Sequence, residues 1–308
     1  MTHRGPGPSA RGARARRVLP PSPSSIDLHT HTRHSDGVLE PTALVVAAAA
    51  AGIRTLAITD HDTLAGVPGA GKIASEIGVD LIPGLEVNSV ADDTDGFHEG
   101  ELHVLGLGVD PGNAHLLAAL ERQREHRRQR FWQIVDRLRE LELSVDDVIR
   151  SLPLHDDDAL GRPTVARALV ANGHAQSVDD AFQRLLTRGR PAYIPRQGLG
   201  PKGAIEAIRG AGGIAVLAHF AEAVQRPSVV RDLMALGLRG LEVYYRAFAA
   251  GLVADLEALA GALRLVPTGG SDYHGDRETY ADAHAALWVP PEVAAGLHAA
   301  IEDQAQHP

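Results

Sequence analysis

Short apolar runs alternate with amphipathic segments along most of this chain. Seven runs rich in branched and aliphatic residues predict β-strands, at residues 26–30, 54–59, 79–82, 102–107, 214–218, 240–244 and 264–267. Helical patterns lie between most of them, for example at residues 41–51, where Pro41 opens the segment and Gly52 follows it. This alternation predicts an α/β fold with a mainly parallel sheet, either open or closed into a barrel.

The pattern changes between residues 112 and 197, where no strand-like run occurs. Residues 121–141 form a long charged amphipathic segment, and residues 162–172 and 178–187 have the periodicity of two further helices. We therefore expect a helical insertion at 112–197 that covers the substrate, between an α/β body made of residues 26–111 and 198–308. Residues 1–25 are rich in Arg, Pro, Gly and Ser and are expected to form a disordered tail.

Composition limits the possible chemistry. Apolar residues make up 44% of the 308 residues, which is enough for a sizeable core, but no run is long enough to predict a membrane-spanning helix. The N-terminal segment has no apolar stretch typical of a secretory signal, so a cytoplasmic location is expected. There is no cysteine, which excludes disulfides and thiolate metal sites. His, Asp and Glu are therefore the candidate metal ligands.

The charge of the chain is unevenly distributed. Residues 1–26 contain five arginines and no acidic residue, so the formal charge of -9 for the whole chain leaves -14 for the remainder. An acidic body of this kind argues against stable binding of duplex nucleic acid by electrostatics alone. It is compatible with a small basic pocket for one phosphate group.

The first predicted strand ends in Asp27-Leu28-His29-Thr30-His31. Residues two apart in an extended chain point to the same face, so His29 and His31 could bind one metal ion together.

Other polar clusters follow or lie within the remaining strands: Thr59-Asp60-His61-Asp62, Gly84-Leu85-Glu86, His103, Ala218-His219 and Ser271-Asp272-Tyr273-His274. Each cluster alone has an ordinary structural explanation, such as a helix N-cap for residues 59–62 or a turn for residues 271–274. Ligands bind at the carboxyl ends of strands in parallel α/β folds, and the recurrence of N and O ligands at six of these places predicts a metal site. A purely structural metal is disfavoured, because such sites need four ligands and not about nine.

Taken together, these motifs resemble those of the PHP (polymerase and histidinol phosphatase) superfamily. The resemblance extends from about residue 26 to 275 and includes Ser35-Asp36-Gly37 after the first cluster. Gly161-Arg162-Pro163, Pro191-Ala192-Tyr193-Ile194-Pro195 and Gly240-Leu241-Glu242-Val243-Tyr244 resemble a branch of bacterial phosphoesterases that act on nucleoside 3′,5′-bisphosphates and on short RNA 5′ ends. The resemblance implies a distorted (β/α)7 barrel of the PHP type.

The resemblance also implies three sets of metal ligands. The first is His29, His31, Glu86 and Asp272; the second is Glu86, His103 and His219; the third is Asp36, His61 and His274. We expect two or three divalent ions, with Mn²⁺ favoured and Zn²⁺ or Fe²⁺ also suited to such ligands.

Four residues are predicted to take part in catalysis: Glu86, Asp36, His61 and Asp60. The hypothesis is that the ions sharing Glu86 generate a hydroxide nucleophile, while the ion held by Asp36 and His61 grips the phosphate and stabilises the leaving oxygen. Asp60, Asp62 and Asp27 are expected to orient imidazoles, although Asp27 could equally be a buried carboxylate at a strand end.

Arg162 and Arg196 are the candidates for binding a second phosphate group, with an exposed surface arginine as the alternative for each. His34 is expected at the rim of the site. Tyr244 and Tyr245 could stack on a base or belong to the core.

The expected function is hydrolysis of a phosphomonoester, with the 3′-phosphate of a nucleoside bisphosphate preferred and a short oligoribonucleotide as a further substrate. Histidinol phosphate is the alternative substrate with the same chemistry, and a catalytically silent metal-dependent binding module is the alternative from another class. A DNA proofreading nuclease is disfavoured, because the body is acidic and no polymerase segment is present. The sequence leaves the oligomeric state open.

Overall fold

A computed structural model describes residues 24–91, 100–152, 154 and 158–306 of this chain. The predicted disordered tail, residues 1–25, therefore lies almost entirely outside the described residues. Across the described ranges, no helix combines the length and the apolar character needed to span a membrane.

All seven predicted strands are present, in one sheet whose order follows the chain from β1 to β7. They are β1 (Ile26–Asp27), β2 (Thr55–Ile58), β3 (Asp80–Ala91), β4 (Gly100–Leu107), β5 (Ile214–Leu217), β6 (Gly240–Glu242) and β7 (Val266–Thr268). The predicted α/β class is confirmed.

The sheet is mainly parallel, as expected, but β4 runs against both of its neighbours. Four strand pairs are parallel, whereas β3–β4 and β4–β5 are antiparallel. Only eight residues separate β3 from β4 in the chain. A parallel connection needs a crossover of about a dozen residues or more, so the reversal of β4 follows from the length of this connection.

β3 is much longer than predicted, and this changes the position of Glu86. The third strand was expected to end at residue 82, before Gly84-Leu85-Glu86, but it continues through these residues to Ala91. Antiparallel pairing with β4 over residues 84–91 keeps them extended. Glu86 therefore lies inside β3, just beyond Pro83, where the parallel pairing with β2 ends.

The two ends of the sheet are linked by backbone hydrogen bonds. The amide of Leu28 donates to the carbonyl of Gly269 at 3.0 Å, and the amide of Asp272 donates to the carbonyl of His29 at 2.8 Å. Gly270 is required at this junction, because a Cβ there would lie 2.4 Å from the Cβ of His29. The junction closes the sheet into a distorted barrel and brings the segment after β7 against the segment after β1.

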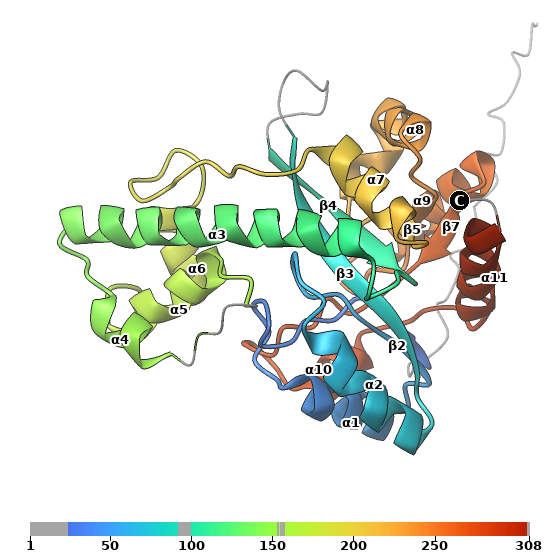
Figure 1. Ribbon diagram of the computed structural model, residues 1–308, viewed down its shortest axis with the longest axis horizontal. Helices are drawn as coiled ribbons and strands as arrows, with labels where there is room; N and C mark the ends of the chain where they lie inside the picture. The colour runs from blue at the N-terminus through green and yellow to red at the C-terminus, as the bar shows by residue number, and fades with distance from the viewer. Residues whose placement is uncertain (1–23, 92–99, 153, 155–157, 307–308) are drawn as a thin grey trace, which may run out of the picture.

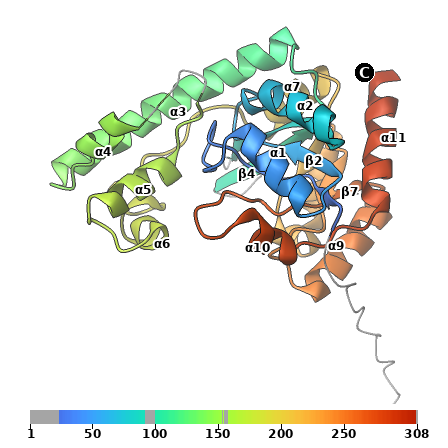
Figure 2. The ribbon, with the colours of Figure 1, turned by 90° about the horizontal axis from the view of Figure 1, so that it is seen from below.

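Helices cover the outside of the sheet in two groups (Figures 1 and 2). One group packs on a cluster that includes Leu56 and Ile58 of β2 and consists of α1 (Pro41–Ala50), α2 (Gly66–Ile77) and α10 (Tyr280–Ala285). The other surrounds the main core and consists of α7 (Pro201–Gly210), η3 (Ala221–Val224), α8 (Pro227–Ala235), α9 (Ala250–Leu263) and α11 (Glu292–Gln306).

The helices predicted between residues 112 and 197 are present, and this segment projects to one side of the barrel (Figure 1). They are α3 (Ala114–Glu140), α4 (Asp146–Ser151), α5 (Arg162–Ala171), α6 (Val178–Ala181) and its π-helical continuation η2 (Phe182–Leu186). No strand occurs in the described part of this segment. Its helices surround a hydrophobic cluster of their own that includes Phe131, Val165 and Leu186. The limits of the insertion as a domain stay a prediction.

Helix α3 joins the barrel core to the insertion core. Leu116 and Leu120 in its first turns belong to the barrel core, and Phe131 and Leu138 belong to the second cluster. Between these apolar positions, the same face buries polar side chains, namely Gln123, Arg124, Arg127 and Arg130. Buried polar groups need partners, and these residues lie where the helix passes the candidate site.

Candidate metal centre

The nine predicted metal ligands converge at one end of the barrel. Three sets of donor atoms lie within 4.8 Å of one another: His29, His31, Glu86 and Asp272; His31, Asp36, His61 and His274; and His61, Glu86 and His103. The ninth residue, His219, places Nε2 3.1 Å from Glu86 Oε1. The first set is the predicted one. The second contains the predicted third set together with His31.

Glu86 is at the centre of this cluster. Five imidazole nitrogens lie within 3.3 Å of its carboxylate oxygens: Nδ1 of His103 and Nε2 of His219 beside Oε1, and Nε2 of His29, Nε2 of His31 and Nδ1 of His61 beside Oε2. Such an arrangement would allow one carboxylate to bridge two ions, and the bridging role of Glu86 stays a prediction.

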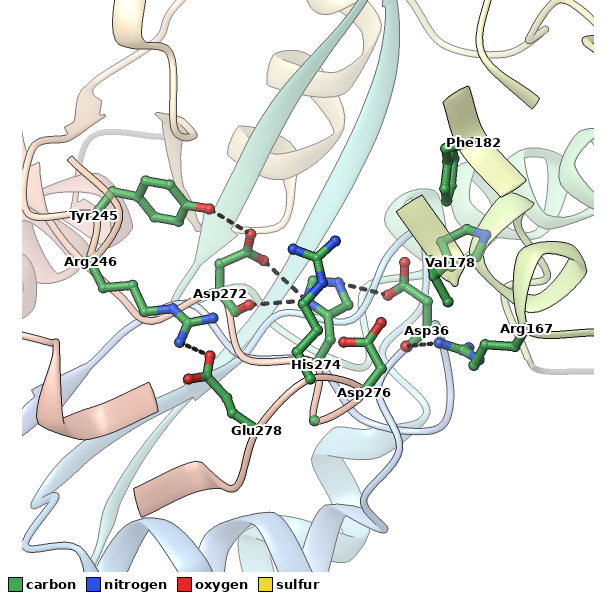
Figure 3. A pocket seen from close by; sticks show the side chains of 13 residues that line it. Asp36, Arg167, Val178, Phe182, Tyr245, Arg246, Asp272, His274, Asp276 and Glu278 are labelled. Atoms are coloured by element: carbon green, nitrogen blue, oxygen red, sulfur yellow. Dashed lines mark hydrogen bonds and ion pairs between the residues drawn. The ribbon is translucent and has the colours of Figure 1, made fainter. Parts of the chain in front are cut away.

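Asp36, Asp272 and His274 form the outer side of the cluster (Figure 3). Nε2 of His274 lies 3.2 Å from Asp36 Oδ1, and Nδ1 lies 3.6 Å from Asp272 Oδ1. Asp272 Oδ1 is also 3.2 Å from Nε2 of His31. Each of these side chains therefore faces both the inner ligands and the adjoining pocket.

Several donor atoms in this cluster are buried without a hydrogen-bond partner among the described residues. They are Nε2 of His29, Nε2 of His31, Nδ1 of His61, Oδ1 of Asp36 and Oε2 of Glu86. Leaving one buried polar atom unsatisfied costs about 1–3 kcal/mol, so five in one place need a compensating partner. Divalent cations would satisfy all of them, and the donor set of imidazoles and carboxylates suits Mn²⁺, Zn²⁺ or Fe²⁺.

In the metal-free cluster, attraction between the carboxylates and the imidazoles shifts their pKa values. Burial lowers the pKa of His274, but the Asp36 and Asp272 carboxylates outweigh it and raise that pKa to about 10. Burial raises the pKa of Glu86, but the imidazoles of His61 and His103 outweigh it and hold the pKa well below its usual range. The ionised Asp36 and Asp272 carboxylates thus face a His274 imidazole that holds its proton at neutral pH, whereas burial keeps the pKa of His61 well below its usual value.

Metal binding is therefore expected to release protons and to weaken as the pH falls. His274, with its pKa raised to about 10, is protonated at neutral pH in the metal-free protein, so a metal ion must displace that proton. Calorimetric titration of Mn²⁺ in two buffers of different ionisation enthalpy measures the number of protons released. Identical heats in the two buffers would contradict the prediction.

Backbone strain is concentrated in this region. Of the five non-glycine residues with positive φ in the described chain, three adjoin the cluster: Asp62 at 52°, His219 at 33° and Asp272 at 50°. Conformations of this kind cost on the order of 1–3 kcal/mol each and persist where surrounding contacts impose them.

The three aspartates expected to orient imidazoles make other contacts. Asp27 accepts hydrogen bonds from Ser271 Oγ at 2.6 Å and from Tyr280 at 2.8 Å, so it holds the turn before Asp272. Among the described residues, it contacts His29 through the backbone amide, which donates to Asp27 Oδ1 at 3.3 Å. The expected contact with an imidazole is wrong for Asp27, because its oxygens are used by the turn.

Asp60 lies behind the cluster and is 1% exposed. It accepts from Thr32 Oγ1 at 2.6 Å and from Ser35 Oγ at 2.8 Å, and Ser35 Oγ in turn lies 3.4 Å from His31 Nδ1. Asp60 therefore reaches an imidazole only through Ser35. The catalytic role given to it stays a prediction, and its contacts are those of a residue that shapes the 32–35 loop.

Asp62 belongs to a network with helix α3 that the sequence reasoning missed. Its Oδ2 accepts from Arg127 at 2.7 Å, and the same Arg127 nitrogen donates to the Asn88 side chain at 2.8 Å. Asn88 Nδ2 is 2.7 Å from Nε2 of His103. The polar residues at helical spacing within the apolar stripe of α3 could have indicated that this face of the helix contacts buried polar groups.

Glu242 was also missed as a functional residue. It ends β6, is 1% exposed, and lies with Oε1 2.9 Å from Nδ1 of His29. Glu242 lies in the segment Gly240–Tyr244, which contributes to the family resemblance, but the sequence analysis predicted no role for it.

A pocket of about 440 Å³ opens over the cluster, and both predicted substrate arginines line it, together with Arg127. Arg162 lies over the Phe182 ring at 5.7 Å, and Arg196 is 3.6 Å from Asp62 Oδ2. A neighbouring cavity of about 260 Å³ shares Phe182 with the first (Figure 3). The two cavities form one groove between the insertion and the barrel.

The remaining candidates are His34, Tyr244 and Tyr245, and they lie in three different surroundings. Nδ1 of His34 lies 3.3 Å from Asp158, outside the ligand cluster. Tyr244 is 4% exposed and stacks edge-on against Trp288, so it belongs to the core. Tyr245 lines both cavities and donates to Asp272 Oδ2 at 3.2 Å.

Comparison with known proteins agrees with this architecture. The PHP domain model matches residues 27–183. The 5′-3′ exoribonuclease Rnm of Escherichia coli (strain K12) is 39% identical over 197 residues, 63% of this chain and 64% of that protein, so the match spans less than two thirds of the exoribonuclease. The 3′,5′-nucleoside bisphosphate phosphatase of Chromobacterium violaceum is 31% identical over 274 residues, 87% of this chain and 93% of that protein.

A solved structure shares the fold. The crystal structure of a Bifidobacterium adolescentis protein, named as a candidate metal-dependent phosphoesterase, has a TM-score of 0.79 at 30% identity and covers 91% of this chain and 97% of its own. The expected distorted barrel of the PHP type is thus confirmed. With a family match over half of its residues and this shared fold, the chain belongs to the PHP domain family.

Proposed function

We propose that this protein is a metal-dependent phosphoesterase that hydrolyses the 3′-phosphate of nucleoside 3′,5′-bisphosphates. The observation that supports the proposal most directly is the set of buried nitrogen and oxygen atoms around Glu86 that have no hydrogen-bond partner among the described residues, beneath a pocket lined by three arginines. The nine predicted ligands and the catalytic assignments to Glu86, Asp36 and His61 are part of this proposal.

The pocket has two functional parts, the candidate metal cluster and the three arginines that line it. Bound divalent ions would lower the pKa of a water nucleophile and neutralise charge on the phosphoryl oxygens. Asp36, Asp272 and His274 lie at the pocket surface of the cluster, where the scissile phosphate would approach. Tyr245 fixes Asp272 through its hydroxyl group.

The second phosphate of the substrate would bind to the arginines. Arg162, Arg127 and Arg196 line the same pocket as the cluster, and a guanidinium group can donate two parallel hydrogen bonds to a phosphate. A substrate with two phosphates separated by a ribose matches a site with two separate centres of positive charge. The name of the Chromobacterium violaceum relative supports this substrate class.

Short RNA 5′ ends are a further proposed substrate, supported by the name of the Escherichia coli relative and by the continuous groove. The deciding experiment incubates the Mn²⁺-loaded protein with adenosine 3′,5′-bisphosphate, histidinol phosphate and a 5′-phosphorylated RNA oligomer and measures the products. Preferred turnover of the bisphosphate supports the proposal. Preferred turnover of histidinol phosphate would replace the substrate, and no turnover of any would favour a binding module.

Replacing Arg162 by Met is expected to raise KM for the bisphosphate by about 10–100-fold, because a hydrogen bond to a charged group contributes about 1.5–3 kcal/mol. The KM for a substrate with only the scissile phosphate should change much less. Steady-state kinetics with both substrates test this, with Arg150→Met as the control, since Arg150 is an exposed arginine of the same insertion. Equal changes for the two substrates would contradict a role in binding the second phosphate.

A further inference from the structure

Glu242 lies behind the metal cluster and uses its two carboxylate oxygens for two different ligand residues. Oε1 lies 2.9 Å from Nδ1 of His29, and Oε2 accepts from the backbone amide of His219 at 2.6 Å. His29 belongs to the first ligand set implied by the family resemblance, and His219 to the second, which is Glu86, His103 and His219. Glu242 itself is 1% exposed, so water cannot easily replace either contact.

The contact with His29 determines which nitrogen is offered to the cluster. Because Nδ1 faces Glu242, Nε2 is directed inward, 3.3 Å from Glu86 Oε2 and 3.4 Å from Asp272 Oδ1. A carboxylate that accepts from the outer nitrogen of an imidazole fixes the ring orientation and makes the inner nitrogen a better ligand. The full burial of His29 leaves the ring little freedom to turn.

The contact with His219 holds a strained backbone. His219 follows β5 with φ of 33°, a conformation unfavourable for a residue with a side chain. The short hydrogen bond from its amide to Glu242 keeps the residue in this conformation, and from there Nε2 reaches within 3.1 Å of Glu86. Without that acceptor, the amide of His219 would lose its hydrogen-bond partner, and its backbone would no longer be held in this conformation.

We propose that Glu242 is a positioning residue that couples the two metal-ligand sets that share Glu86. One oxygen orients His29 in the first set, and the other fixes the backbone of His219 in the second. The inference rests on the proposed metal centre, and it predicts that a change at Glu242 affects both sets together, although the side chain faces neither the pocket nor the substrate.

The test compares Glu242→Ala, which removes both acceptors, with Glu242→Gln, whose amide has one acceptor oxygen for two donors. Mn²⁺ is titrated into the metal-free full-length protein by calorimetry, and binding is also followed by competition with a chelator. We expect affinity to fall by about 10–100-fold in Glu242→Ala at both sites that share Glu86, with a smaller loss in Glu242→Gln. Affinity like that of the unmodified protein in both variants, or a loss at one site only, would overturn the proposal.

Glu257→Gln is the matched control, because Glu257 is a carboxylate of the same barrel that accepts a hydrogen bond from Tyr244 in the core at 3.0 Å. Metal affinity should be unchanged in this variant. Circular dichroism and thermal unfolding establish that each variant is folded. If Glu242→Ala does not fold, the comparison uses Glu242→Gln and Glu242→Asp instead. Glu242→Asp keeps the charge but shortens the side chain. Unchanged metal affinity in both variants would overturn the proposal.

Failure of this inference is distinguishable from failure of the proposed function. Metal affinity is measured without substrate, so the Glu242 result stands even if no phosphate ester is turned over. Conversely, an unmodified protein that hydrolyses the bisphosphate, together with Glu242 variants that bind Mn²⁺ normally, would leave the function in place and remove the positioning role.

Discussion

Replacement of Glu86 by Gln is expected to lower kcat/KM for phosphate release by at least about 100-fold, the upper end of the loss seen when an outer partner of a metal ligand is removed. Glu86 is the one side chain in the described cluster that contacts five imidazoles. An amide keeps the shape of the side chain but loses the negative charge that would hold two cations together. Metal content measured by mass spectrometry should fall in parallel.

The fold should survive this change. Glu86 is buried and Gln has the same shape, so the packing around β3 is kept, although the attraction between the ionised carboxylate and the imidazoles is lost. Circular dichroism should therefore show an unchanged secondary structure. Glu76→Gln, at an exposed position of α2, is the control for the same chemical change. Full activity and metal content in Glu86→Gln would refute the assignment of the centre.

His29→Ala is expected to give the same result by a different route. His29 is fully buried and supplies an inner nitrogen to the first ligand set, so its loss should abolish phosphate release and reduce the bound metal. The control is His298→Ala, because His298 is a half-exposed histidine that pairs with Asp80. Retained activity with normal metal content would rule out His29 as a ligand.

The second large effect is expected at Arg127, whose replacement by Met should destabilise the fold by about 3–5 kcal/mol. Arg127 is 5% exposed and pairs with the fully buried Asp62 at 2.7 Å. Among the described residues, its removal leaves the more distant Arg196 guanidinium, at 3.6 Å, as the ion-pair partner of the buried Asp62 carboxylate. Urea denaturation of the full chain measures the change in the free energy of unfolding.

A double variant separates the loss of charge balance from the loss of packing. Arg127→Met combined with Asp62→Asn removes both charges and should recover a large part of the lost stability. Arg128→Met is the neighbouring control, because Arg128 is partly exposed and its pair with Glu125 at 3.5 Å is of the surface type that contributes about 0–1 kcal/mol. Equal stability of Arg127→Met and Arg128→Met would contradict the argument.

Arg127 connects the insertion to the chemistry as well as to the fold. Arg127 donates to the side chain of Asn88, which in turn lies 2.7 Å from Nε2 of His103. The Arg127 guanidinium also lines the pocket. The double variant should therefore recover stability while its kcat/KM stays low. The residue comes from the middle of a helix whose two ends pack on two separate hydrophobic cores, so both cores determine where it lies.

Much of the candidate site could be predicted from the sequence, because metal ligation restricts residue types severely. Only His, Asp and Glu could serve in a chain without cysteine, and they occur next to apolar strands that fold in chain order. The His29 and His31 pair could be predicted from local geometry alone, since an extended chain directs alternate residues to one side.

The supporting residues could not be predicted in the same way. Glu242 and Arg127 are ordinary residues in their local sequence, and their roles arise from contacts across 213 and 65 positions of the chain. The direction of β4 and the extension of β3 likewise depend on which strands become neighbours. Local periodicity reports a residue's secondary structure and its exposure, but it contains no information about a distant partner.

The sequence by itself thus predicted the seven strands, the helical segment and the clusters that contain most of the candidate ligands, because strand periodicity and metal chemistry both act over a few residues; the grouping of the ligands into sets came from the family resemblance. Only the tertiary structure decided that Glu86 lies inside a strand at the centre of five imidazoles, that Asp27 and Asp60 support turns, and that Glu242 and Arg127 lie behind and above the cluster. These positions depend on the closure of the sheet and on the packing of α3 between two cores, which no short stretch of sequence can specify.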